Sequence, residues 1–257
     1  MSFTVRAITL DLDDTLWPFA PIGARIEQAI HDWMLLHSPR TARMFPIPAM
    51  RALRERTFAD NPDLAHDVSA LRRLTLAHAL RNSGADLSLL EPAFEAFYAA
   101  RNQVECYPDS LDALRRIAAR MPVAAITNGN ADLQRIGLAG HFAFQLGACE
   151  HGAAKPDRGI FLAACTRLGC RPAEVLHVGD HVETDVAGAA RAGLRACWLN
   201  RVGARWERED LRPDLEFAAL TDLADWLDAQ AREDGSRTPP AQGRLGNRPP
   251  DPSVPGR

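Results

Sequence analysis

The sequence predicts an α/β protein built on a parallel sheet, with a helical domain inserted after the first strand. Two observations lead to this prediction. Short apolar segments alternate with helical segments along most of the chain, which is typical of a parallel sheet covered by helices. Residues 18–105 interrupt the alternation with helical periodicity and no convincing strand, and about 85 residues are too many for a loop.

Six segments are predicted as strands because they are short, apolar and followed by polar or glycine-containing turns. They are residues 6–10, 123–127, 144–148, 175–178, 195–199 and 215–217, the last a short edge strand. Helices are predicted between them at 110–120 behind an Asp109 cap, 131–137, 159–168, and 185–192 closed by Gly193. Together these elements predict a Rossmann-like parallel sheet with helices on both faces.

The insertion and the tail define the predicted domain boundaries. Isoleucines at 22, 26 and 30 begin an apolar helical stripe, and further helices are predicted at 50–58, 68–81 and 89–101. We therefore predict a helical cap at 18–105 and a sheet domain at 1–17 and 106–230. Residues 231–257 contain six prolines, four glycines and few large apolar side chains, which predicts a disordered tail.

The composition argues against several classes of protein. A net charge of -3, with arginines spread among acids, gives no reason to expect nucleic-acid binding. No apolar run approaches the ~18 residues of a transmembrane helix, and the N-terminus does not resemble a signal peptide. The five cysteines include no Cys-x-x-Cys pair, which indicates reduced thiols in a cytoplasmic protein. No feature of the sequence specifies an oligomeric state.

The first predicted strand ends in an unusual group of acids, Asp11-Leu12-Asp13-Asp14-Thr15. Strand alternation puts the side chains of Asp11 and Asp13 on the same side. Unpaired carboxylates ~4 Å apart repel by about 4 kcal/mol at an effective dielectric constant of ~20, so a cation or proton must balance them. The group therefore predicts a metal-assisted nucleophile with an acid or base beside it.

Lys155 is the single lysine among the 30 basic residues of the chain, the others being arginine. The codon usage of a GC-rich genome also produces such a bias. However, an ammonium is a compact point charge, whereas a guanidinium is a wide planar fork. Since Lys155 lies in a Gly- and Pro-containing loop before a predicted helix, we interpret it as a site residue rather than a surface lysine.

Polar groups occur in four separate segments that we place at the carboxyl ends of strands, the edge where open parallel sheets bind ligands. The segments are 11–15, 127–130, 155–156 and 179–185. Singly, each is a common turn or helix entrance. Together they offer three acids for a divalent metal, and a hydroxyl, backbone amides and a lysine for an anion. This combination indicates a magnesium-dependent phosphoryl-transfer site.

The four segments resemble, in order, the four motifs of the haloacid-dehalogenase-like hydrolase superfamily, over about residues 5–228. The resemblance implies that Asp11 is the nucleophile and that Asp13 is the general acid and then the base. It implies that Thr127, the Asn128 amide and Lys155 hold the phosphoryl group. It also implies a Mg²⁺ ion held by the Asp11 side chain, the Asp13 backbone carbonyl and Asp180, with Asp185 supporting the ion directly or through water.

Asp13 distinguishes the chain from dehalogenating members of the superfamily, which lack an acid there because a halide needs no proton. A closer resemblance is to bacterial phosphatases of flavin mononucleotide (FMN) and 5-amino-6-(5-phospho-D-ribitylamino)uracil. It includes Ala-Ile-Thr-Asn-Gly-Asn-Ala at 125–131, Leu-His-Val-Gly-Asp at 176–180 and, in the insertion, His66-Asp67-Val68 and Arg72. It implies a small phosphorylated metabolite as the substrate.

Three alternatives stay open at this point. The first is a phosphatase for another metabolite, such as phosphoglycolate or a nucleotide. The others are a receiver-type signalling domain and a binding protein on an inactive phosphatase fold. We interpret His177 as a buried structural histidine and Arg51, Arg54 and Arg56 as a solvated helix face, whereas His181 is equally compatible with either role.

Overall fold

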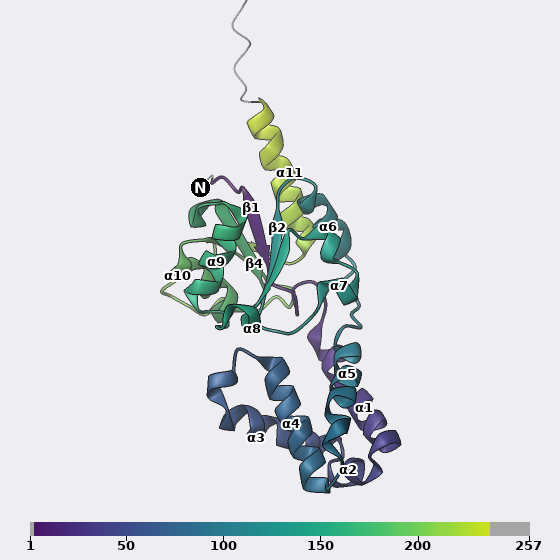
Figure 1. The fold of residues 1–257 in the computed structure, drawn as a ribbon. Coiled ribbons are helices and arrows are strands. Elements are labelled where there is room, and N and C mark those ends of the chain that lie inside the picture. The colour runs from purple at the N-terminus through teal and green to yellow at the C-terminus, as the bar shows by residue number, and fades with distance from the viewer. Residues whose placement is uncertain (1–2, 237–257) are drawn as a thin grey trace, which may run out of the picture.

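The computed structural model describes residues 3–236, and its centre is a six-stranded parallel sheet (Figure 1). The strands are β1 (Ala7–Leu10), β2 (Val123–Thr127), β3 (Phe144–Gly147), β4 (Val175–Gly179), β5 (Arg195–Leu199) and β6 (Leu215–Phe217). Their order is β3-β2-β1-β4-β5-β6, so β1 pairs with β2 on one side and β4 on the other. The predicted α/β class and parallel sheet are confirmed.

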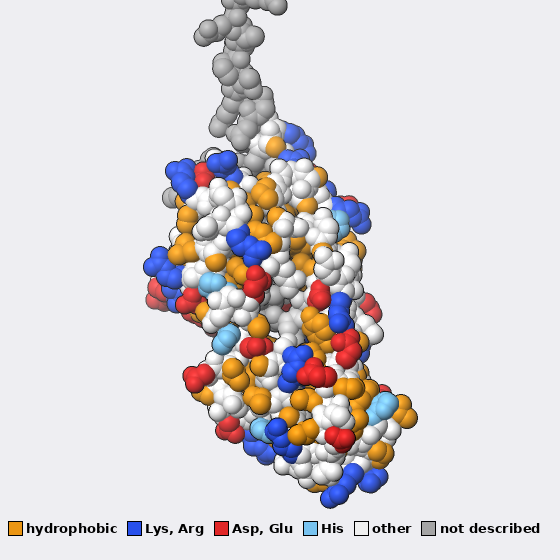
Figure 2. Space-filling view, in the orientation of Figure 1, with side chains coloured by type: hydrophobic (Ala, Val, Ile, Leu, Met, Phe, Trp, Pro, Cys, Tyr) orange, Lys and Arg blue, Asp and Glu red, His pale blue; other side chains and the backbone are white. Residues whose placement is uncertain are grey.

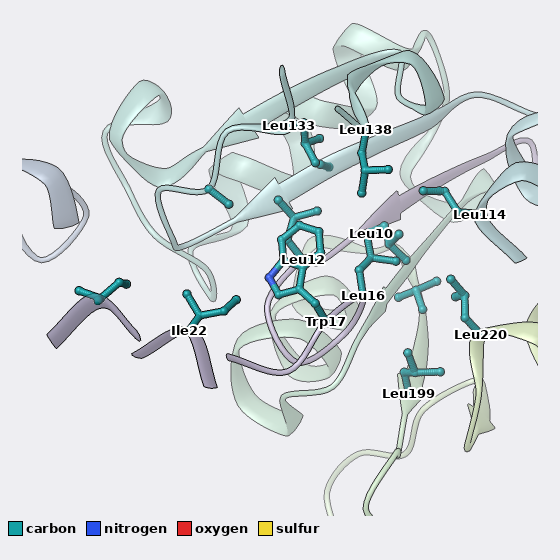
Figure 3. Close-up of a cluster of buried hydrophobic side chains, with 14 of the residues drawn as sticks. Leu10, Leu12, Leu16, Trp17, Ile22, Leu114, Leu133, Leu138, Leu199 and Leu220 are labelled. Atoms are coloured by element: carbon teal, nitrogen blue, oxygen red, sulfur yellow. The ribbon is translucent and has the colours of Figure 1, made fainter. Parts of the chain in front are cut away.

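Strand residues alternate between two hydrophobic clusters, one on each face of the sheet. Ile8 and Leu10 of β1 join the cluster formed with α6 (Ser110–Ala118) and α11 (Leu220–Ser236). Ala7 joins the other cluster, with α9 (Arg158–Leu168) and α10 (Gly188–Ala192). Figure 3 shows the first cluster, where Leu114 of α6 and Leu220 of α11 approach Leu10. Because both faces are covered, β1, β2 and β4 are buried along their whole length.

The insertion after β1 consists of five α-helices, which lie together beyond the carboxyl ends of the strands (Figure 1). They are α1 (Phe19–His37), α2 (Pro39–Met44), α3 (Ile47–Asp60), α4 (Val68–Ser83) and α5 (Leu90–Arg101). Helix α2 was not predicted, because its six residues are too few to show a period; Pro39 begins it at a position where proline is favoured. The domain boundaries themselves stay a prediction.

The sheet domain also contains α7 (Leu133–Ile136), α8 (Ala148–His151), two 3₁₀ turns at Ala139–His141 and Pro172–Glu174, and a π-helical turn at Val182–Ala187 that precedes α10. Asp109 does not cap α6 as predicted. Its backbone is already helical, and its carboxylate instead accepts hydrogen bonds from Arg201 (2.9 Å) and from the Leu220 backbone (2.7 Å). Asp109 therefore ties the start of α6 to the start of α11.

Helix α11 extends into the stretch predicted as the tail, 231–257, and the disorder of that tail stays a prediction. The last residue of α11 is Ser236. The rest of the predicted tail, 237–257, lies outside the described residues. None of the described helices has the length and hydropathy needed to span a bilayer. In Figure 2, charged side chains of both signs are interspersed over the visible face.

Candidate active site

The structure brings the four polar segments together at the carboxyl edge of the sheet. Asp11 follows β1, Thr127 ends β2 and Asp180 follows β4. Because β1 lies between β2 and β4, these three residues leave adjacent strands. The loop that carries Lys155 reaches the same edge, where its ammonium contacts Asp11.

A buried chain of charges links Asp11, Lys155 and Asp185. Lys155 Nζ donates to Asp11 Oδ1 at 2.5 Å, to Asp185 Oδ1 at 2.7 Å and to the carbonyl oxygen of Ile126 at 3.0 Å. These three bonds use all three protons of the ammonium. Lys155 is only 3% exposed, so its charge is held in a fixed place. The interpretation of Lys155 as a surface lysine is therefore excluded by its burial.

The side chain of Asn128 holds the Lys155 loop in place. Its Oδ1 accepts from the Lys155 backbone at 2.7 Å, and its Nδ2 donates to the Lys155 carbonyl at 2.9 Å. Thr127 is buried, and its hydroxyl accepts from the Gly129 backbone at 3.0 Å. The predicted contacts of Thr127 and the Asn128 amide with a phosphoryl group stay predictions.

The acids at this edge carry more negative charge than Lys155 balances. Burial raises the pKa of the Asp11 carboxyl to about 8, although the Lys155 charge opposes the shift. Burial and then the charge of Asp185 raise the pKa of Asp180 to about 6. Burial also acts on Asp185, but Lys155 and His177 hold its pKa below the usual range. The site therefore favours either a proton or a cation.

The donor set fits a hard divalent cation. Asp11, Asp180 and Asp185 each offer a carboxylate oxygen, and these atoms lie within 4.8 Å of one another. The Thr15 hydroxyl lies 3.3 Å from Asp11 Oδ2 and 3.1 Å from Asp180 Oδ1, which orients both groups. Clustered carboxylate oxygens are the ligands that Mg²⁺ prefers. No described contact tests the Asp13 carbonyl as a further ligand, so that role stays a prediction.

We expect the apparent affinity for Mg²⁺ to increase with pH from about 6 to about 8 and to level off above. In the metal-free protein the raised pKa values of Asp11 and Asp180 keep protons on these groups at lower pH, and the cation must displace them. Calorimetric titration with MgCl₂ at several pH values measures this dependence. A constant affinity between pH 6 and 8 would contradict it.

Two donors hold the Asp13 side chain in place. Trp17 Nε1 donates to Asp13 Oδ1 at 2.8 Å, and Arg101 Nη2 donates to Asp13 Oδ2 at 2.6 Å. Asp14 has a φ of 58°, which turns the chain so that Trp17 folds back beside Asp13. A Cβ atom on Gly129 would lie 2.7 Å from Asp13 Oδ2, so a larger residue there would displace the Asp13 carboxylate.

Arg101 is a site residue that the sequence did not reveal. Arg101 is the last residue of α5 and lies 88 residues from Asp13 in the chain. Only 2% of its surface is exposed. Its Nε also donates to Asn130 Oδ1 at 3.2 Å, while its buried Nη1 has no hydrogen-bond partner among the described residues. In the sequence, Arg101 looks like any arginine in the last turn of an amphipathic helix, so no local signal distinguishes it.

We expect Arg101→Met to lower kcat by roughly tenfold to a hundredfold, because Asp13 loses the donor that fixes Oδ2. Steady-state kinetics with acetyl phosphate and with a poorer leaving group measure the effect, which should be larger for the poorer one. Arg135→Met is the matched control, since Arg135 pairs with Glu95 on the surface. Equal kcat values in both variants would show that Arg101 has only a structural role.

His177 is buried and structural, as predicted. Its Nδ1 lies 2.9 Å from the Thr9 hydroxyl and its Nε2 lies 3.2 Å from Asp185 Oδ1. Burial lowers the pKa of His177, which favours the neutral ring. His181 shapes the π-helical turn: its Nδ1 accepts from the backbones of Glu183 and Thr184. Both histidines therefore position Asp185 or its turn.

The comparisons with known proteins agree with this geometry. A family model for haloacid dehalogenase-like hydrolases matches residues 5–193. The chain is 33% identical over 229 residues to the 5-amino-6-(5-phospho-D-ribitylamino)uracil phosphatase YigB of Escherichia coli K12, covering 85% of this chain and 94% of YigB.

Two solved structures are similar over most of the chain. A 2-haloacid dehalogenase from Pseudomonas syringae pv. Tomato DC3000 matches with a TM-score of 0.82 and 38% identity, covering 88% of this chain and 100% of that one. The hydrolase YfnB from Bacillus subtilis, solved with magnesium bound, matches with a TM-score of 0.63 and 20% identity, covering 88% of this chain and 99% of that one. At that identity YfnB shows the fold alone.

The chain belongs to the haloacid dehalogenase-like hydrolase family. It is an enzyme of the family's phosphatase and hydrolase class.

Proposed function

We propose that the protein is a Mg²⁺-dependent phosphomonoesterase that uses Asp11 as its nucleophile. The observation that carries the proposal is the buried Asp11–Lys155–Asp185 chain beside Asp180. A carboxylate attacks an anionic phosphoryl group only if its own charge is offset. Lys155 offsets part of that charge. A Mg²⁺ ion held by Asp11, Asp180 and Asp185 would offset the rest and would neutralise charge on the phosphoryl oxygens.

In the proposed reaction, Asp11 attacks phosphorus while protonated Asp13 gives its proton to the departing alkoxide. Water then attacks the aspartyl-phosphate, Asp13 accepts the proton of that water, and inorganic phosphate leaves with Asp11 restored. Trp17 Nε1 and Arg101 Nη2 each hold one oxygen of the Asp13 carboxyl and so fix its orientation. Thr127 and the Asn128 backbone amide would hold phosphoryl oxygens, and Lys155 would bridge Asp11 and the phosphate by exchanging one of its three present hydrogen bonds for a phosphoryl oxygen.

We propose that the substrate belongs to the class of FMN and 5-amino-6-(5-phospho-D-ribitylamino)uracil, and that the enzyme acts in the cytoplasm. The likeness to YigB supports this class, because it extends over 85% of the chain and so includes the helical insertion. The insertion lies beyond the edge that carries the catalytic groups, where the leaving group of a substrate would extend (Figure 1).

The name of the Pseudomonas syringae relative suggests haloacid dehalogenation as a competing activity. Asp13 argues against it, because a departing halide takes no proton and a dehalogenase needs no acid at this position. The two activities are separated by incubating the enzyme with 2-chloropropionate and measuring chloride. Chloride release at a rate comparable to phosphate release from FMN would contradict the phosphatase proposal.

A substrate panel tests the proposal. We expect FMN and the ribitylaminouracil phosphate to be hydrolysed with kcat/KM at least tenfold above that of phosphoglycolate, or about 1.4 kcal/mol of transition-state binding. Removal of Mg²⁺ with EDTA should abolish all phosphate release. If phosphoglycolate or a nucleotide proved the best substrate by tenfold, the proposed substrate class would be wrong, although the phosphatase mechanism would stand.

A further inference from the structure

An open pocket with a volume of about 360 Å³ lies beside the candidate metal ligands. Its walls come from the loop after β1, the residues before α6, the turn after β4, and β5 with the loop that follows it. They include Asp14, Tyr107, Asp180, His181 and Ala204. All of the lining residues lie outside helices α1–α5. Asp14, His181 and Ala204 are exposed, so the pocket opens to solvent.

The pocket reaches the metal site through Asp180. Of the three carboxylates that could hold a divalent cation, those of Asp11 and Asp185 belong to buried residues, whereas Asp180 is partly exposed. Asp180 also lines the pocket. A cation that arrives through the pocket therefore meets the most accessible of the three ligands first.

The insertion covers the catalytic edge with contacts of its own. Arg101, at the end of α5, is only 2% exposed and donates to Asp13 at 2.6 Å. Ser69 of α4 accepts from Asn130 Nδ2, in the loop after β2, at 3.0 Å. An approach from the side of the insertion would require such contacts to break, whereas an approach through the pocket leaves them intact.

Hydrogen bonds hold the pocket open. Arg201 donates to the Thr15 carbonyl at 3.0 Å, and its guanidinium lies over the Tyr107 ring, with Cζ 4.0 Å from the centroid. Asn200 holds both ends of one peptide: its Oδ1 accepts from the Ala204 backbone at 2.8 Å, and its Nδ2 donates to the Ala204 carbonyl at 2.9 Å. Because these walls are bonded in place, the pocket is accessible without a conformational change.

The charges around the pocket favour a cation. Asp14 and Asp180 both line it. Arg201 also lines it, but two hydrogen bonds to the Asp109 carboxylate, at 2.9 and 3.2 Å, offset its charge. Burial and then the charge of Asp14 raise the pKa of Tyr107, which is consistent with a negative potential at this wall. A concave surface that carries one sign of charge concentrates ions of the opposite sign.

We propose that this pocket is the route by which Mg²⁺ reaches and leaves Asp11, Asp180 and Asp185, and that Asp14 attracts the ion at its mouth. The inference rests on the proposed Mg²⁺ dependence of the phosphatase. An octahedrally hydrated Mg²⁺ ion takes up roughly 200 Å³, at about 30 Å³ per water, so it fits within the pocket. Since the route avoids the insertion, the metal can exchange while α4 and α5 keep their contacts with the sheet domain.

Ala204→Phe tests the route by narrowing the pocket. Stopped-flow fluorescence follows association when metal-free protein is mixed with MgCl₂, and dissociation when Mg²⁺-loaded protein is mixed with excess EDTA. Trp198 reports both, because its Nε1 donates to the Asp180 carbonyl at 2.8 Å. A narrowed route slows entry and exit alike, so both rate constants should fall at least tenfold while Kd stays within twofold of the wild-type value. Ala173→Phe, in the exposed turn before β4 at the other edge of the sheet, is the control and should leave both rate constants unchanged.

Asp14→Asn tests the attraction separately. Asparagine tolerates the left-handed backbone of Asp14, where φ is 58°, and its Oδ1 can still accept the hydrogen bond from the Phe19 backbone. Loss of the charge should lower the association rate constant at least threefold at low ionic strength and weaken its dependence on salt. Asp63→Asn, in the exposed turn Pro62–Leu64 of the insertion, is the control and should match the wild type.

The outcomes separate the route from the phosphatase function. Wild-type rate constants in Ala204→Phe, or a changed Kd with an unchanged association rate constant, would overturn the route. An association rate constant in Asp14→Asn equal to that of the wild type at every salt concentration would overturn the role of Asp14. Absence of Mg²⁺-dependent hydrolysis of acetyl phosphate by the wild-type enzyme would instead overturn the proposed function.

Discussion

Lys155→Arg should lower kcat by about a hundredfold or more, even though the positive charge is kept. The ammonium of Lys155 lies between Asp11, Asp185 and the Ile126 carbonyl, with all three contacts at 2.5 to 3.0 Å. A guanidinium is wider, and overfilling a buried site typically costs about 1–3 kcal/mol. It would displace Asp11 from the position that attack on phosphorus requires. Steady-state kinetics with acetyl phosphate at saturating Mg²⁺ measures the loss.

Arg167→Lys is the matched control for this exchange. Arg167 pairs with Glu150 on the surface, where an ion pair contributes little, so the variant should match the wild type. Lys155→Met should destabilise the metal-free protein more than Lys155→Arg does, because breaking a buried ion pair costs roughly 3–5 kcal/mol. Wild-type kcat in Lys155→Arg would mean that codon usage alone explains the single lysine.

Asp11→Asn should reduce phosphatase activity by roughly 10³-fold or more, because an amide does not form the covalent phosphoryl intermediate. Its effect on stability should depend on pH and metal. Burial raises the pKa of Asp11 in the folded metal-free protein to about 8, from an ordinary value of 3.8. The stabilisation from its protonated form is therefore fully present below pH 3.8 and is lost as the pH rises through about 8.

At pH 8 and above, with EDTA present, Asp11→Asn should consequently be at least as stable as the wild type. It should gain less from added Mg²⁺, because one ligand is weaker. Differential scanning calorimetry with and without Mg²⁺ measures both effects, and Asp112→Asn on the exposed side of α6 is the control. A folded Asp11→Asn enzyme with substantial activity would disprove Asp11 as the nucleophile.

Most of the fold could be predicted because its determinants are local. The buried strands β1, β2 and β4 appear in the sequence as short apolar runs, and Gly137 and Gly193 end helices in the left-handed conformation that glycine favours. Helix α2 was missed because one and a half turns show no period. Asp109 was misread as a cap because its real partners, Arg201 and the Leu220 backbone, are distant in the chain.

The sequence by itself determined which side chains lie at the carboxyl ends of the strands, because periodicity and turn chemistry depend on only a few neighbouring residues. Asp11, Thr127 and Asp180 could be assigned to strand ends in this way, and the single lysine marked Lys155. Only the tertiary structure decided that Arg101 holds Asp13 and that Arg72 lies unpaired beside Phe97. These contacts depend on how α4 and α5 pack against each other and on how the end of α5 meets the loop after β1. An arginine on a helix looks the same in the sequence whether it faces water or a buried carboxylate.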